Sequence, residues 1–201
     1  MQRVLDAASE LFARQGIRAT TLDQVGALSG TGRGQLYLWF AGKPDLVQDV
    51  VAQQVERVLA SQQPLLDTMS SAADVRAWCD RAVAVHSVDD PVHCPIGSLV
   101  NELGEAEPAA RRALRDGFAR WAPKLQEGLE RTAARGELAA AVTPESAAHA
   151  LLAGYQGGVL LSSAAGTVTP LRTALAGVSD AVLVTPATAA PGRHAAARRT
   201  R

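Results

Sequence analysis

Residues 20–46 read TTLDQVGALSGTGRGQLYLWFAGKPDL, and this stretch decides the fold. It opens with Thr21-Leu22-Asp23-Gln24, the spacing of a capping box, in which the threonine hydroxyl accepts a backbone N–H and the glutamine reaches back. The box predicts a short helix over about 22–28, which Ser29-Gly30-Thr31 then breaks. A second short helix is predicted over about 32–39. Two short helices joined by a glycine turn indicate a helix-turn-helix.

The flanking residues complete a three-helix unit. Apolar residues at helical spacing predict a first helix over about 3–14, and Gly16 is placed to end it. Pro44 lies in the first turn of the next helix, where its missing N–H costs nothing. We therefore assign residues 1–46 to a helix-turn-helix domain. Its expected core consists of Leu22, Val25, Leu28, Leu36 and Phe40.

The second part of the chain, residues 47–184, also shows helical patterns. No run of alternating β-branched or aromatic residues is typical of a strand, so the predicted fold class is all-α. Pro123 is expected to kink a long helix. Thr143 and Thr169 each precede a proline and are expected to cap the helices that follow. Beyond the helix opened by Pro44, the predicted helices cover about 71–86, 96–104, 108–136, 143–164 and 169–183.

The net charge of the 201-residue chain is zero, with 20 Lys+Arg and 20 Asp+Glu. Residues 1–46 hold five basic and four acidic side chains, a net charge of +1, and residues 47–184 hold 11 and 16, a net charge of −5. Residues 185–201 hold four arginines, and their Ala/Arg composition predicts a disordered basic tail. The totals exclude a wholly basic, histone-like protein but not a local basic surface.

Three sequence features concern the cellular compartment. Charged side chains within residues 2–11 argue against a signal peptide. Two cysteines, Cys79 and Cys94, cannot build a disulfide framework, so we expect a reduced cytoplasmic protein. Residues 146–170 carry no charge and are long enough to span a bilayer. Their glycines and thin aliphatic content favour a helix buried between subunits instead, so no membrane partner is expected.

The block from Thr20 to Leu46, with the helix before it, resembles the DNA-binding domain of the TetR family of bacterial transcriptional regulators. The family pattern is a Thr-capped helix, a turn, a Lys-Gly-x-Leu-Tyr-x-x-Phe recognition helix and a following lysine. Gly26 departs from it by replacing a usual alanine. The resemblance implies a three-helix DNA-binding domain followed by a helical ligand-binding and dimerisation domain. The matching positions are Thr21, Gly30, Arg33-Gly34-Gln35-Leu36-Tyr37, Phe40 and Lys43.

The recognition helix carries side chains suited to reading DNA. Gln35 can bond adenine at two atoms, and Arg33 can bond guanine in the same way or lie on a phosphate. Gly34 has no side chain, which lets the helix approach the groove wall. In the alternative interpretation, Arg33 is merely solvated, and Tyr37 and Trp39 pack. The remaining predicted DNA contacts, mostly to the phosphate backbone, are Thr21, Thr31, Tyr37, Trp39 and Lys43.

The second domain resembles its counterpart in the family through CPIGSLVNELGE at 94–105 and RTAARGEL at 131–138. In that family the last two helices pair with those of a second subunit, which implies a homodimer through about 144–164 and 170–183. Helix packing within one subunit is the alternative. An apolar inducer pocket is expected where several helix faces converge, although each residue is equally suited to the core. The pocket residues are Trp78, His86, Cys94, Ile96, Leu99, Leu103, Phe118, Trp121 and Tyr155.

Other chemistry has little support in the sequence. The loop 86–94 contains two histidines, two aspartates and Cys94, but no second ligand cluster accompanies it, so neither metal nor cofactor is predicted. Cys94 is either a reactive thiol or a small buried residue. The chain has no G-x-S-x-G, phosphate loop, H-E-x-x-H or C-x-x-C motif, so no enzyme is predicted.

These observations predict a homodimeric, ligand-responsive transcriptional regulator, a repressor by the habit of the family. Each subunit would insert the 32–39 helix into the major groove of a palindromic double-stranded operator. A small, largely apolar inducer would then shift the reading heads out of register. The alternative is a helical small-molecule binding or scaffold protein without specific DNA binding.

Overall fold

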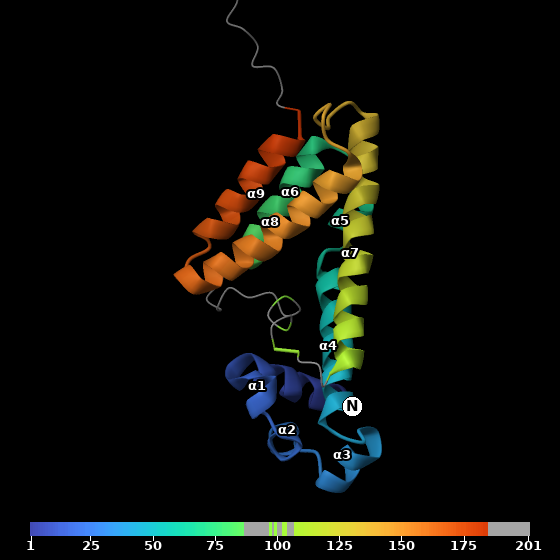
Figure 1. Ribbon diagram of the computed structural model, residues 1–201, viewed down its shortest axis with the longest axis vertical. Coiled ribbons are helices and arrows are strands. Elements are labelled where there is room, and N and C mark those ends of the chain that lie inside the picture. Colours follow the sequence, from blue (N-terminus) through green and yellow to red (C-terminus); the bar gives the residue numbers. More distant parts are fainter. Residues whose placement is uncertain (87–96, 98, 100–101, 104–106, 185–201) are drawn as a thin grey trace, which may run out of the picture.

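A computed structural model describes residues 1–86, 97, 99, 102–103 and 107–184. Over these residues the chain is helical, and its only extended pairing is an isolated antiparallel bridge between Leu138 and Leu183. The predicted all-α class is thereby confirmed. Helices α1 to α3 gather at one end, α4 and α7 run side by side along the molecule, and α8 and α9 lie with α6 toward the other end (Figure 1).

The helix-turn-helix forms where the capping box predicted it. In α2 (Leu22–Ser29), the Thr21 hydroxyl accepts the Gln24 N–H at 3.2 Å, and the Gln24 side chain accepts the Thr21 N–H at 2.8 Å. Gly30 ends α2 with φ of +67°, a left-handed conformation that glycine adopts without strain. The recognition helix α3 (Arg33–Trp39) follows after two residues.

The first helix, α1 (Gln2–Ala19), is interrupted at the predicted glycine but continues beyond it. Gly16 has φ of +81° and ψ of 159°, a conformation outside the helical region, and one more turn follows through Ala19. The prediction was therefore right about the break and wrong about the end of the helix. The expected core position of Leu28 was also wrong, because 47% of that side chain is exposed.

The packing around position 26 explains why a glycine stands where the family pattern has an alanine. Gly26 is buried in α2, and a Cβ added there would lie 3.0 Å from both Leu36 Cδ1 and the Thr31 carbonyl oxygen. The missing side chain lets α2 approach α3 closely, which offsets the weak helix propensity of glycine.

Helix α4 (Lys43–Ser61) connects the two ends of the molecule and lies against α7 (Pro108–Ala134). The two helices approach closely at Gly117, where an added Cβ would lie 2.6 Å from a methyl group of Val55. The assigned helix α7 continues through Pro123, which cannot donate to the carbonyl of Ala119 four residues earlier. Between α4 and α7, the described chain adds a four-residue helix that the sequence did not predict, α5 (Leu65–Thr68), and α6 (Ala72–Val85).

The last two helices are α8 (Pro144–Ala165) and α9 (Thr169–Val182). Thr143 caps α8 by accepting the Ser146 N–H at 3.1 Å, as predicted. The matching prediction for Thr169 was wrong, because this residue lies inside the first turn and α9 has no side-chain cap. An added Cβ on Gly158 would lie 2.8 Å from the Leu171 Cα. The close approach that Gly158 permits is therefore between α8 and α9 of the same subunit.

Two sequence predictions concern segments outside the described residues. Most of the expected helix 96–104 and the whole expected tail 185–201 belong to them. Among the helices that are described, none is long and apolar enough to cross a membrane.

Candidate DNA-binding surface and ligand site

The exposed face of α3 carries most of the predicted DNA contacts. Leu36 and Phe40 turn inward, each 1% exposed. At 3.6 residues per turn, the opposite side of the helix holds Gly34, Gln35 and Leu38. All three are exposed, and an added Cβ on Gly34 would meet no atom within 4 Å. The structure therefore presents Gln35 on a smooth, outward surface at one end of the molecule.

Leu38 was missed by the sequence analysis. It is 85% exposed, the most exposed of the large apolar side chains in the described chain. An apolar side chain in this position on a reading helix suits contact with a thymine methyl group. Its position opposite Leu36 and Phe40 in the helical repeat was the available signal.

Arg33 and Tyr37 flank this surface and contact each other. The Arg33 guanidinium lies 5.7 Å from the centre of the Tyr37 ring, and its Nε is 3.5 Å from a carboxylate oxygen of Asp23. The hydrogen bond to Tyr37 and the Asp23 charge raise the pKa of Arg33. All three side chains are largely exposed, so these contacts are weak and orient Arg33 without removing it from solvent. Trp39, 36% exposed, lies on the other flank.

Two of the other side chains predicted to contact DNA, Thr21 and Lys43, also make hydrogen bonds within the protein. The Thr21 hydroxyl is engaged in the capping box of α2. The Lys43 ammonium donates to the carbonyl of Arg18 at 3.0 Å, which ties the start of α4 to the end of α1. An ammonium has three donors, so this bond leaves capacity for a phosphate. Thr31 is half-buried beside α3.

Five of the predicted ligand residues meet in an aromatic cluster at α6, α7 and α8, with three of them buried and two, His86 at the end of α6 and Phe118, partly buried. Tyr155 lies at its centre, with ring centroids at 5.4 Å to Trp121, 6.1 Å to Trp78 and 5.7 Å to His86. The His86 ring nitrogen and the Tyr155 hydroxyl are 2.8 Å apart. Phe118 stacks beside Trp121 with an interplanar angle of 5°. We refer to these five residues as the aromatic cluster.

The remaining predicted ligand residues divide into two groups. Leu99 and Leu103 are 6% and 5% exposed and belong to the same continuous apolar core. Cys94 and Ile96 lie outside the described residues, so their positions relative to the aromatic cluster are not assigned.

A bond between the two domains had no signal in the local sequence. The carboxylate of Glu102, half-buried beside Leu103, accepts the backbone N–H of Ile17 at 2.6 Å. This N–H lies directly after the break at Gly16, where the regular helical hydrogen bonding is interrupted. The two partners are 85 residues apart in sequence. Glu102 therefore connects the segment that carries two predicted ligand residues to the first helix of the DNA-binding domain.

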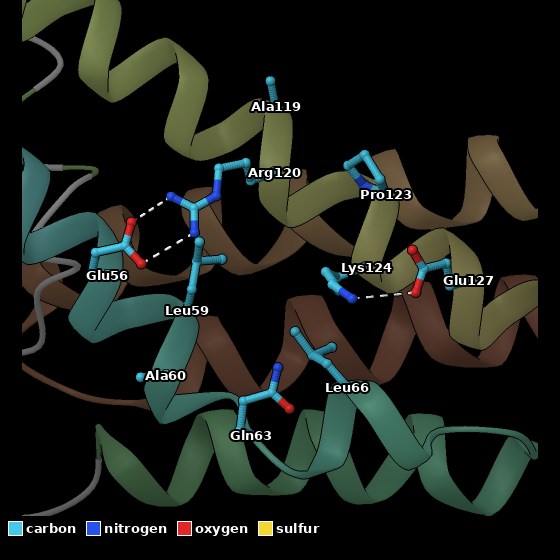
Figure 2. Close-up of a pocket in the computed structure, with 10 residues that line it drawn as sticks. All are labelled: Glu56, Leu59, Ala60, Gln63, Leu66, Ala119, Arg120, Pro123, Lys124 and Glu127. Atoms are coloured by element: carbon cyan, nitrogen blue, oxygen red, sulfur yellow. Dashed lines mark hydrogen bonds and ion pairs between the residues drawn. The ribbon is translucent and has the colours of Figure 1, made fainter.

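A groove of about 520 Å³ lies on the outer side of the molecule between α4 and α7 (Figure 2). Leu59, Leu66 and Pro123 contribute apolar lining. Across it, Arg120 makes two hydrogen bonds to the Glu56 carboxylate, which lower the pKa of that group. None of the predicted ligand residues lines this groove. It is thus a surface where side chains of α4 and α7 pair with each other, separate from the aromatic cluster.

Two leucines and two glycines of α8 and α9 are exposed. Leu160 and Leu161 are 65% and 60% exposed. An added Cβ on Gly157 or Gly177 would meet no atom within 4 Å. The glycines of α8 therefore serve two purposes, since Gly158 packs against α9 and Gly157 faces outward. We call the exposed residues Gly157, Leu160, Leu161 and Gly177 the outer face.

The thiol and metal predictions concern the two cysteines, Cys79 and Cys94, and the loop 86–94. Burial raises the pKa of the Cys79 thiol to about 12, so it is protonated and unreactive at neutral pH. The expected loop from 87 to 94 is outside the described residues. In the parts of the chain that are described, no three metal-ligating side chains gather.

Comparison with known proteins identifies both halves of the chain. Residues 4–50 match the model for bacterial regulatory proteins of the tetR family, and residues 71–178 match the model for the tetracyclin repressor-like C-terminal domain. The chain is 28% identical over 176 residues to the HTH-type transcriptional regulator LmrA of Bacillus subtilis, covering 85% of this chain and 89% of LmrA.

Solved structures show the same fold along nearly the whole chain. Reduced NemR of E. coli superposes with a TM-score of 0.80 at 20% identity, covering 92% of this chain and 97% of NemR. The complex of SmeT with triclosan superposes with a TM-score of 0.74 at 25% identity, covering 96% and 97%. SmeT is the repressor of the multidrug efflux pump SmeDEF of Stenotrophomonas maltophilia.

Proposed function

The chain belongs to the TetR family of bacterial transcriptional regulators, and on this premise we propose that it is a dimeric, ligand-released repressor. Its helix-turn-helix makes it a DNA-binding protein, and its relatives are regulators rather than enzymes. In the proposal it acts in the cytoplasm on a palindromic operator. The observation that carries the proposal is the exposed reading face of α3, which Gly34, Gln35 and Leu38 form and where a Cβ added on Gly34 would meet no atom within 4 Å.

On the operator, α3 enters the major groove. Gln35 reads a base edge, Leu38 contacts a thymine methyl group, and Gly34 allows close approach. Arg33, already oriented by Asp23 and Tyr37, reads a neighbouring guanine or holds a phosphate. Thr21, Thr31, Tyr37, Trp39 and Lys43 position the domain along the sugar-phosphate backbone.

Two subunits are needed to read two half-sites one helical turn apart. We assign the dimer contact to the outer face, because four solvent-exposed leucines and glycines on adjacent helices form a surface that close helix packing can bury. The absence of a side chain on Gly157 and Gly177 permits two helices to approach across a twofold axis.

The effector site is assigned to the aromatic cluster together with Leu99 and Leu103. These side chains come from several helices of the second domain. SmeT, a protein of similar fold, has been solved in complex with triclosan, which is a small aromatic molecule. A small, largely apolar molecule suits their chemistry. Its binding would favour a spacing of the two reading heads that misses adjacent major grooves.

The test is a salt-dependent binding assay on the DNA upstream of the protein's own coding region, with a random sequence of equal length as competitor. Preference for the upstream DNA at moderate salt supports the proposal, and equal binding of both contradicts it. Gln35→Ala should cost about 1–3 kcal/mol at one base pair and relax specificity there. Lys43→Ala should weaken binding to all sequences and reduce the salt slope by about one.

A further inference from the structure

Two buried tryptophans of the second domain differ in their hydrogen bonding. Trp78 and Trp121 are 1% and 0% exposed. The indole N–H of Trp78 donates to the Gln62 side chain at 2.6 Å. The indole N–H of Trp121 has no acceptor within the described part of the molecule. Buried indole N–H groups usually have a partner, so this donor calls for an explanation.

The unpaired donor lies within the aromatic cluster. Phe118 is parallel to the Trp121 ring with centroids 6.4 Å apart, and Tyr155 meets it edge-on at 5.4 Å. Aromatic faces of this kind attract planar rings in offset or edge-to-face contact. Trp121 therefore combines apolar aromatic surroundings with one donor that the described residues leave unpaired.

The other polar atoms of the cluster favour an uncharged ligand. The Tyr155 hydroxyl and the His86 ring are bonded to each other. None of the five side chains of the cluster is a carboxylate, a guanidinium or an ammonium group. A cationic ligand would find no counterion among these residues, and an anion would need a protonated His86, whereas a neutral carbonyl or ether oxygen needs only the indole donor.

We propose that the effector is a neutral, planar aromatic compound that carries a hydrogen-bond acceptor, and that the Trp121 indole N–H donates to that acceptor. This inference rests on the proposed ligand response and assigns the chemical class of its effector. The rings of Phe118 and Tyr155 bind the aromatic part, and Trp121 selects the acceptor. A hydrocarbon of the same shape leaves the indole N–H unpaired and binds more weakly.

The experiment compares two probes of nearly identical shape, 2-acetylnaphthalene and 2-isopropenylnaphthalene, which exchange a carbonyl oxygen for a methylene group. Their dissociation constants are measured by calorimetry on the full-length wild-type protein, on Trp121→Phe and on the control Glu130→Ala, which changes an exposed residue of α7 outside the aromatic cluster. We expect the wild type and Glu130→Ala to favour the ketone by about five- to tenfold, the factor of one net hydrogen bond. Trp121→Phe should bind both probes equally.

NMR spectroscopy tests the same inference on the wild-type protein, so the result does not depend on whether a variant folds. The indole N–H resonance of Trp121 in the wild type should move downfield with the ketone and not with the alkene, while that of Trp78 stays in place with both. Equal affinities in the wild type, or an unchanged Trp121 resonance, would overturn the inference and leave the ligand response standing. If the wild type prefers the ketone but the ketone does not release the protein from operator DNA, the proposed ligand-released repression is contradicted. The inference about the Trp121 indole N–H would then still hold.

Discussion

The bond between Glu102 and Ile17 yields a prediction about how the two domains are coupled. Replacing Glu102 by alanine removes the acceptor of a backbone N–H whose residue is only 1% exposed. Hydrogen bonds to charged groups contribute about 1.5–3 kcal/mol, and the 2.6 Å distance and partial burial place this one within that range. We therefore expect Glu102→Ala to lose about 1.5–3 kcal/mol of unfolding free energy, and Glu102→Gln about half as much.

The assay combines urea unfolding with hydrogen exchange at the Ile17 amide. Loss of the acceptor should speed exchange of this amide by about 10- to 100-fold, which corresponds to about 1.4–2.8 kcal/mol. The matched control is Glu130→Ala, which removes an exposed glutamate of α7 that accepts only from Gln126 on its own helix. Glu130→Ala should leave both the Ile17 amide and the unfolding free energy nearly unchanged.

The same variants test the coupling itself. If the bond transmits effector binding, the ratio of operator affinities with and without 2-acetylnaphthalene should move toward one in Glu102→Ala and stay at the wild-type value in Glu130→Ala. Unchanged exchange at Ile17 in Glu102→Ala would refute the hydrogen bond. Faster exchange with an unchanged affinity ratio would refute the coupling role and leave the bond as a purely structural contact.

Three further predictions concern other parts of the chain. Gly34→Ala should raise the unfolding free energy by about 0.5–1 kcal/mol, because its Cβ meets no neighbour, while tighter operator binding by this variant would contradict close approach at the groove. Leu161→Glu should shift the dimer toward monomer in analytical ultracentrifugation, whereas the exposed control Gln48→Glu should not. If the Leu161→Glu dimer is as stable as the wild type, the outer face is not the dimer contact. In a Cys94→Ser background, Cys79 should resist Ellman's reagent at pH 8 until urea unfolds the protein, because burial raises its pKa to about 12. Rapid labelling of the folded protein would show that this thiol is accessible.

The features that the sequence predicted well depend on neighbouring residues. The capping box at Thr21 and the glycine turn at Gly30 act over three or four residues, so their geometry could be predicted without knowledge of the tertiary structure. The aromatic cluster was also predictable, because Trp78, Trp121 and Tyr155 lie on apolar faces of separate helices that must bury them.

The features that the sequence missed depend on the tertiary structure. Glu102 and Ile17 are distant in the chain, and nothing in the local pattern of either predicts their bond. Thr169 has the composition of a cap, but the chain enters α9 one residue earlier. Gly26 reduces helix propensity, and only the closeness of Leu36 and the Thr31 carbonyl explains its presence. For Glu102 and Gly26, a contact across the fold prevails over the local preference.

The magnitudes of the interdomain contacts indicate which of them an effector can alter. Helix α4 is covalently continuous, and its close contact with α7 at Gly117 and Val55 leaves no room for a shift toward α7. The ion pair between Arg120 and Glu56 is more than half exposed, so it contributes about 0–1 kcal/mol and restrains α4 little. The Glu102 bond falls between these extremes. Its strength of about 1.5–3 kcal/mol is comparable to a typical allosteric coupling energy of about 1–3 kcal/mol. An effector that displaces the Glu102 carboxylate can therefore break this bond while α4 and α7 stay packed together.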